Sequence, residues 1–297
     1  MYHRGHRAVQ HEAGVLDRAD HAGRAIRTSI PDVAARFLAE RPVLFLGADD
    51  GGGRLWATSL TGEPGFLRVA DPGTLVIGAR PAAVDPLAGA LAGPTPVGMI
   101  AVDPGTRRRM RVNGTAHPEG DGLVVRVDRV FANCPKYIQQ RLPEPGPAGT
   151  PRVTGRGAAL TAGQRERVRA ADTFFVTTAS GEGGVETSHR GGNPGFVRVT
   201  SPTELEWPDY AGNAMFLTLG NLALHPAAGL LFPDWGTGAA LHVSGRARVE
   251  TSPERVAAHP GAERVVLFTA TDVVEVAGLS PLRWSAPGYS RFNPHVA

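Results

Sequence analysis

A short polar run in the second half of the chain, Ser188-His189-Arg190, is followed at once by Gly191 and a second glycine. An arginine guanidinium can bind a phosphate through two parallel hydrogen bonds, and a glycine lets the backbone come close to a ligand. These four residues are therefore candidates for binding a phosphorylated ligand. A glycine-rich hairpin with solvated polar side chains has the same pattern, and the residues alone do not separate the two interpretations.

A helix start is the second candidate phosphate site. Asn213 precedes an apolar run, so we predict a helix over 214–224 with Asn213 as its N-cap. The free N–H groups at a helix N-terminus attract anions, and Gly212, which follows Tyr210 in the expected approach loop, lets the backbone reach a phosphate. A capped helix without a ligand is the alternative interpretation.

The segment 131–139, FANCPKYIQ, contains the single cysteine of the chain, Cys134, and its single lysine, Lys136. Lys136, with Asn133 nearby, can neutralise a phosphate, although an ordinary surface charge is an equally good interpretation. Cys134 has no evident histidine partner, which favours a small buried thiol over a nucleophile. One cysteine excludes an intrachain disulfide and a metal site built from several cysteines.

Composition and charge exclude several classes of function. The net charge is only +3 and no basic run is interleaved with aromatic residues, so we expect no nucleic-acid binding; the arginines 107–109 are interpreted as a hairpin turn. No apolar run approaches the ~20 residues of a membrane helix, and the polar N-terminus lacks a secretion signal, which predicts a cytoplasmic protein without membrane contact. His3, His6 and His11 match no zinc motif, so we expect solvated histidines and no metal.

The elements that must position these residues occur twice. Residues 97–116 align without a gap on 228–247, and residues 57–69 resemble 186–199. Matching turns, strands and spacing predict that the chain is two copies of one unit. The Pro/Gly-rich stretch 142–157 between them has the composition of a linker.

Each copy is expected to consist mainly of short strands. Runs of β-branched or aromatic residues alternate with Gly, Pro and Asp turns, which is typical of strands. Strand-dense units with one inserted helix indicate a small closed barrel, because closure removes sheet edges. The expected helices are 31–40, 85–91, 161–171 and 214–224. The expected division is an N-terminal helical extension (1–30), a first copy (31–141), a linker (142–157) and a second copy (158–297).

Three stretches, 131–139, 188–199 and 208–232, resemble the pyridoxamine 5′-phosphate oxidase-like family of FMN-binding split β-barrels, in particular a subgroup described only as predicted flavin-nucleotide-binding proteins. The resemblance implies a mainly β fold with short helices, built as two tandem FMN-binding split β-barrels. In the family FMN lies in the cleft between two barrels, mostly of a homodimer, and a tandem chain can build that cleft alone. The resemblance also implies that Arg198 faces the flavin and that a helix begins after Cys134.

The two pseudo-equivalent clefts are expected to differ. Where the second copy has His189-Arg190, the first copy has Leu-Thr followed by Glu63, and an acid repels phosphate. We therefore predict one flavin site in the chain, built mainly by the second copy. The predicted FMN-binding residues are Ser188, His189, Arg190, Gly191, Arg198, Tyr210, Gly212, Asn213, Asn133 and Lys136.

The function implied by the resemblance is that of an FMN-dependent oxidoreductase that acts on an unidentified small molecule, with a nicotinamide or molecular oxygen as redox partner. His189 and Tyr210 are the candidate proton-transfer residues. Oxidation of pyridoxamine phosphate itself is disfavoured, because Phe-Leu-Thr at 216–218 replaces the Arg/Lys pair of that activity. The alternatives are a non-catalytic carrier of a flavin, a deazaflavin or haem, with His189 or His242 as haem ligand, and a structural barrel with an empty cleft.

Overall fold

The computed structural model describes residues 2–147, 149–181 and 184–296. The chain begins with the helices α1 (Arg4–Glu12), α2 (Leu16–Gly23) and α3 (Asp32–Ala39). The strands of the first half are β1 (Val43–Asp49), β2 (Leu55–Thr61), β3 (Leu67–Asp71), β4 (Thr74–Ile77), β5 (Thr95–Asp103), β6 (Arg108–Glu119) and β7 (Gly122–Ala132). A short 3₁₀-helix, η1 (Ala90–Ala92), precedes β5.

The remaining elements follow residue 142. Between the halves lie β8 (Pro143–Pro145) and β9 (Arg152–Gly157). The strands of the second half are β10 (Thr173–Ala179), β11 (Val185–Gly191), β12 (Arg198–Val199), β13 (Glu204–Tyr210), β14 (Ala227–Pro233), β15 (Ala240–Glu250), β16 (Ala262–Ala277) and β17 (Leu282–Trp284). Its helices are α4 (Ala162–Ala170), α5 (Leu217–Leu224) and α6 (Pro253–Ala257).

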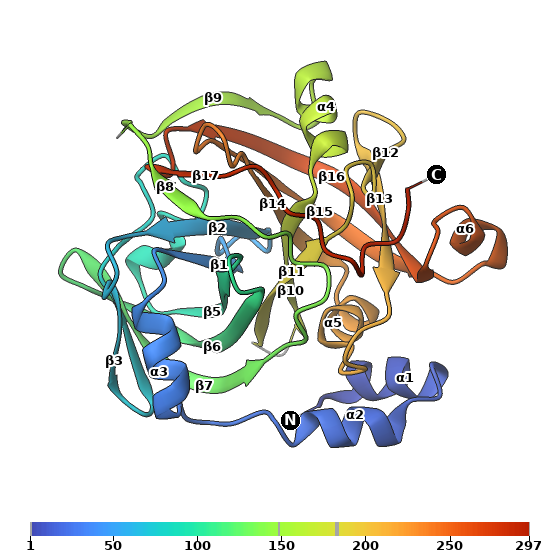
Figure 1. The fold of residues 1–297 in the computed structure, drawn as a ribbon, viewed down its shortest axis with the longest axis horizontal. Coiled ribbons are helices and arrows are strands. Elements are labelled where there is room, and N and C mark those ends of the chain that lie inside the picture. The colour runs from blue at the N-terminus through green and yellow to red at the C-terminus, as the bar shows by residue number, and fades with distance from the viewer. Residues whose placement is uncertain (1, 148, 182–183, 297) are drawn as a thin grey trace.

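Two large antiparallel sheets form the body of the molecule (Figure 1). The first has the order β2-β1-β5-β6-β7-β4-β3 and the second the order β11-β10-β14-β15-β16-β13-β12, with β9 paired to β16. Each strand of the first sheet therefore has a counterpart at the same place in the second. The predicted fold class, mainly β with short helices, is confirmed. The predicted division of the chain begins at residue 1 and ends at residue 297, and these two residues lie outside the described part of the structure.

The two sheets approach each other closely at glycines. A Cβ atom added to Gly98 on β5 would lie 2.6 Å from the backbone nitrogen of Thr187 on β11, and one added to Gly229 on β14 would strike the backbone of β2. At the same interface the rings of Phe45 and Phe175 stack with their centroids 3.5 Å apart. Because β1 and β10 are covered on both faces, nearly all of their residues are buried. This arrangement brings the edge strand β11 against the first sheet.

Two helix predictions need correction. The segment 85–91 forms turns that end in η1, and Gly89 in its middle weakens a helix. The loop after β7 consists of turns rather than a helix, and Tyr137 there has a φ of 66°. Among the residues that the structure describes, no helix combines the length and apolar character needed to cross a membrane.

The stretch 142–157 has more structure than its linker composition indicates. Its first strand, β8, pairs with β17, and its second, β9, adds to the second sheet beside β16. Backbone hydrogen bonds of a sheet edge are available to any chain that passes alongside, whatever its side chains. Composition reports flexibility of the free chain and cannot show this pairing.

The N-terminal helices pack beside α5, which Figure 1 shows next to α1 and α2. His3 Nε2 lies 2.8 Å from Asn221 Oδ1, and His6 Nε2 lies 3.2 Å from the carbonyl oxygen of Leu217. The side chain of His6 is buried, with 1% of the residue surface exposed. The expectation that these two histidines are solvated is therefore wrong, since they connect α1 to α5.

Burial of His6 predicts a loss of stability in mild acid. Burial, followed by the charge of His3, lowers the pKa of His6 to about 4, against about 6.5 in an unfolded chain. Between these two values the unfolded state binds more protons, so the free energy of unfolding falls as the pH is lowered. Chemical denaturation across this window should show a steeper loss for the wild type than for His6→Asn, which has no proton to bind. Equal slopes would contradict a buried, neutral His6.

Candidate functional site

One pocket gathers residues from both sheets. It lies where β6 and the loop after β7 meet β11, the end of β13 and the start of α5. Its volume of about 120 Å³ is several times the ~30 Å³ of a liquid water molecule and below the ~300 Å³ at which pockets for whole ligands begin. The enclosed part therefore has room for one end of a ligand, not for a whole nucleotide.

Three arginines from two sheets line this pocket. Arg109 and Arg111 are two residues apart on β6 and so share one face of the strand, while Arg190 lies on β11. Arg111 Nη2 lies 2.5 Å from Glu186 Oε2, and Arg129 Nη2 lies 3.0 Å from Glu186 Oε1. Glu186 is buried, so this carboxylate neutralises only the deep side of the cluster.

Arg109 and Arg190 have no carboxylate within salt-bridge distance among the described residues. Arg109 Nη1 lies 3.2 Å from His189 Nδ1, and Arg190 Nη1 donates to the His189 carbonyl at 3.2 Å. The Nε atoms of both arginines are buried without a hydrogen-bond partner. Burial and the two neighbouring arginines lower the pKa of Arg109 to about 10, and burial lowers the pKa of Arg190. Both stay charged at neutral pH. Asp209 offsets part of the charge of Arg190 from beyond salt-bridge distance, and an incoming anion would neutralise the positive charge that remains.

His189 is neutral and has a defined tautomer. A guanidinium can only donate, so Nδ1 accepts from Arg109 and the ring proton belongs on Nε2. Burial, and then the charges of Arg109 and Arg190, hold the pKa of His189 well below its ordinary value. At neutral pH this side chain is a hydrogen-bond donor and not an additional cation.

The start of α5 forms another wall of the pocket, in a geometry that the sequence does not predict. The N-cap is Phe216, whose φ of 52° is left-handed, so the prediction of Asn213 as N-cap is wrong. Asn213 Oδ1 instead accepts from the N–H of Met215 at 3.1 Å, which stabilises the turn before the helix. Asn213 and Gly212 still line the pocket.

Two tyrosines and the loop after β7 complete the site. The rings of Tyr137 and Tyr210 lie with their centroids 5.0 Å apart, and the Tyr137 hydroxyl donates to the carbonyl of Ala211 at 3.1 Å. Burial raises the pKa of Tyr210 to about 12, so this phenol keeps its proton. A Cβ atom at Gly191 would collide with the carbonyl of Tyr137, which shows how closely the loop packs on β11.

Most of the residues predicted from the sequence come together here. The pocket is lined by Ser188, His189, Arg190, Gly191, Tyr210, Gly212, Asn213, Asn133 and Lys136, and also by Cys134. Both halves contribute to the lining, and most of the lining residues belong to the second half.

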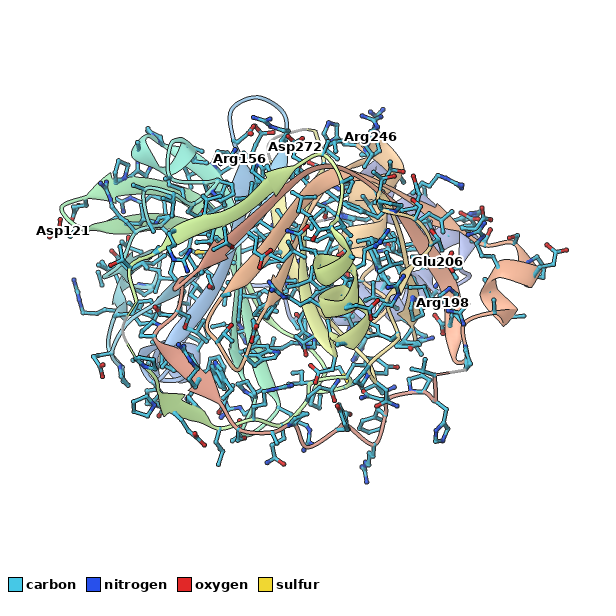
Figure 2. All side chains as sticks on the ribbon, turned by 90° about the horizontal axis from the view of Figure 1, so that it is seen from above. Asp121, Arg156, Arg198, Glu206, Arg246 and Asp272 are labelled. Atoms are coloured by element: carbon cyan, nitrogen blue, oxygen red, sulfur yellow. The ribbon has the colours of Figure 1, made fainter. Side chains whose placement is uncertain are left out.

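Arg198 does not reach this pocket. Its Nη2 donates to the carbonyl of Ala258 at 2.5 Å and its Nη1 lies 4.0 Å from Glu206 Oε1; Figure 2 shows these two charged side chains close together. The reason is that its guanidinium is held by Ala258 and Glu206, although Phe196 and the end of the neighbouring strand β13 line the pocket. Nearness in sequence to Arg190 therefore gives no nearness in space.

Sequence analysis missed Arg109 and Arg111. It assigned 107–109 to a hairpin turn, but the left-handed residue is Arg107, with a φ of 54°, and β6 begins at Arg108. The available signal was the two-residue spacing of Arg109 and Arg111 inside a run already predicted to be a strand, which places both guanidiniums on one face.

The corresponding place in the first half lacks these cations. By the pairing registers, Leu60 on β2 matches Arg190 on β11, and His242 on β15 matches Arg111 on β6. His242 is fully buried, with Nδ1 2.8 Å from the carbonyl oxygen of Ala57, and does not line the pocket. In the described part of the chain no group of His, Cys, Asp and Glu is arranged to hold a metal ion. These differences favour a single anion site.

No family model and no curated protein matches this chain. Among solved structures it is similar to HupZ of Group A Streptococcus, with 12% identity over 37% of this chain and 89% of that chain and a TM-score of 0.32. It is similar to a FAD-binding protein from Mesorhizobium loti, with 13% identity, coverages of 43% and 99% and a TM-score of 0.30. A third is a general stress protein 26-related protein of the pyridoxinephosphate oxidase family from Clostridium acetobutylicum, with 13% identity, coverages of 40% and 89% and a TM-score of 0.31. The structural neighbours of this chain thus include a member of the family that its sequence motifs resemble.

Proposed function

We propose that this pocket binds the phosphate end of FMN and that the chain is an FMN-dependent oxidoreductase acting on a small molecule. The observation that carries the proposal is the pair Arg109 and Arg190, two cations in one pocket without a carboxylate partner among the described residues. Removing charges from water without compensation costs stability. A ligand that supplies negative charge at this place accounts for their presence.

The charge of the pocket suits a phosphate monoester. Three arginines and Lys136 line the pocket together with a single carboxylate, that of Asp209, while Glu186 lies outside the lining and is shared by Arg111 and Arg129. A phosphate monoester carries about −1.5 to −2 at neutral pH, and this excess of positive charge favours its binding. Burial also raises the pKa of Asp209, whose carboxylate lies 3.6 Å from Arg264 Nη1. A bidentate guanidinium contact would satisfy the Nε atoms that now lack partners.

A bound flavin supplies hydride and electron transfer, and the residues of this chain bind and orient it. Arg109 and Arg190 hold the phosphate, His189 offers a neutral Nε2–H donor, and Tyr210 keeps its phenolic proton at neutral pH. Proton transfer by His189 or Tyr210 remains a prediction. We propose a nicotinamide or molecular oxygen as the redox partner.

We also propose that the two halves are duplicated copies. The equal strand order and the close approaches at Gly98 and Gly229, which occupy corresponding strands, support this relationship. Residues of both halves of one chain line the pocket, so one chain builds the place for the phosphate end of the ligand.

Titration with FMN and with riboflavin tests the proposal. Riboflavin has the same ring without the phosphate, so FMN should bind about 10- to 100-fold more tightly if the arginines hold the phosphate. Raising the salt concentration should narrow this difference, because salt screens the charges. Flavin fluorescence on addition of protein measures both constants. Failure of FMN to bind, or equal affinity for both compounds, would overturn the proposal.

A further inference from the structure

The start of α5 has a strained backbone next to the arginine cluster. Ala214 and Phe216 have φ values of 62° and 52°, which are left-handed and unfavourable for residues with a side chain. The segment 214–219 lines the pocket, and the first N–H groups of α5 have no acceptor within their own helix. A strained conformation at such a place persists only when the surrounding structure holds it.

Two side chains of α1 hold this segment from behind. Gln10 Nε2 donates to the carbonyl of Met215 at 2.9 Å, and His6 Nε2 donates to that of Leu217 at 3.2 Å. Both residues are buried: Gln10 has 0% and His6 has 1% of its surface exposed. Their donor roles are fixed, since a carbonyl oxygen only accepts.

These two bonds fix the orientation of two peptide units. A peptide bond is planar and trans, so its C=O and its N–H point in opposite directions. The carbonyl of Met215 shares its peptide with the N–H of Phe216, and the carbonyl of Leu217 shares its peptide with the N–H of Thr218. When α1 binds the two carbonyls, it directs both N–H groups away from itself. Phe216 and Thr218 both line the pocket.

The contact between the two helices leaves little freedom for other arrangements. A Cβ atom at Gly5 would strike the carbonyl of Gly220, and one at Gly220 would lie 2.5 Å from the Cα atom of His6. Beside this crossing Phe131, Met215 and Leu217 form a small apolar cluster that Tyr2 joins. The N-terminal helix is thus packed against the back of the pocket wall.

We infer that Gln10 and His6 are positioning residues that orient the backbone N–H groups of the α5 start toward the phosphate of the ligand. The inference rests on the proposed function and deepens it, since it assigns part of the phosphate contact to a segment far away in the sequence. An independent observation points to an anion at the same place, namely the Nε atoms of Arg109, Arg111 and Arg190, which are all buried without a hydrogen-bond partner. Arg111, only 5% exposed, has a carboxylate on its Nη2 but none on its Nε.

The test compares Gln10→Met with the wild type and with His11→Leu, an exposed residue of the same helix, as matched control. Methionine keeps the size and apolar stem of glutamine and removes its donor. The measured quantity is the ratio of the riboflavin and FMN dissociation constants, which isolates the phosphate contribution. Gln10→Met should lower this ratio about threefold to tenfold through a weaker FMN affinity, with riboflavin affinity unchanged; His11→Leu should leave both unchanged.

The outcomes are separable. An unchanged ratio in Gln10→Met overturns the inference, and so does an equal loss of FMN and riboflavin binding with a lowered melting temperature, because that pattern marks a purely structural role. If the wild type itself does not prefer FMN over riboflavin, the proposed function fails before the variant is considered. His6→Phe, which fills the same space without a donor, should reproduce the effect of Gln10→Met.

Discussion

Arg190→Ala is expected to weaken FMN binding by about 1.5–3 kcal/mol, or roughly tenfold to 150-fold, because charged hydrogen bonds to the phosphate are lost. The same change should leave the ligand-free protein at least as stable as the wild type. Its guanidinium has no carboxylate partner among the described residues and its Nε is buried without a hydrogen bond. Flavin titration and thermal unfolding without ligand measure the two effects on the same preparations.

Arg198→Ala is the matched control for this experiment. Arg198 is close to Arg190 in the sequence and was predicted to face the flavin, but it lies at the other edge of the second sheet with its guanidinium on the carbonyl of Ala258. FMN affinity should therefore be unchanged in Arg198→Ala. If Arg198→Ala weakened FMN binding and Arg190→Ala did not, the pocket described above would not be the phosphate site.

Glu186→Ala is expected to cost about 3–5 kcal/mol of unfolding free energy, the largest loss of stability that we predict for one side chain. Glu186 is 1% exposed and its carboxylate contacts the guanidiniums of both Arg111 and Arg129. Removing it leaves the buried Arg111 and the partly buried Arg129 without their carboxylate, beside Arg109 and Arg190. Chemical denaturation of the ligand-free protein measures the effect.

Glu166→Ala provides the comparison on the surface. Its carboxylate pairs with Arg169 on α4, and its side chain is 74% exposed, so water and salt already screen the interaction. Its loss should cost less than about 1 kcal/mol. Added phosphate or FMN should partly restore the stability of Glu186→Ala and have no special effect on Glu166→Ala beyond that on the wild type. Equal costs for the two variants would show that Glu186 is not a buried counterion.

The strand pattern and the local glycines were readable from the sequence. The alternation of apolar runs with Gly, Pro and Asp turns predicted a mainly β chain. This works because successive side chains of a strand point to opposite faces, a pattern that can be recognised from neighbouring residues alone. The predicted helix over 214–224 began three residues too early. The residue types at 214–216, Ala-Met-Phe, give no indication that Ala214 and Phe216 adopt left-handed backbone conformations. The predicted helix after Cys134 failed for the same reason, because the left-handed Tyr137 in that loop depends on what the loop packs against.

The residue types needed to bind a phosphate were also visible in the sequence, and the structure places Ser188-His189-Arg190 and the loop around Lys136 in the lining of one pocket. The arginines that join them from the other sheet were not visible in the sequence. Arg109 and Arg111 join Arg190 only because β6 of one sheet lies against the edge strand β11 of the other, and Arg198 stays outside because its guanidinium is held by the carbonyl of Ala258. Sequence fixes which side chains share a strand face, since that follows from a period of two. The packing of the two sheets decides which strand faces meet at the pocket. The residues that meet there, such as Arg111 and Glu186, are more than seventy positions apart in the sequence, so only the tertiary structure shows that they are neighbours.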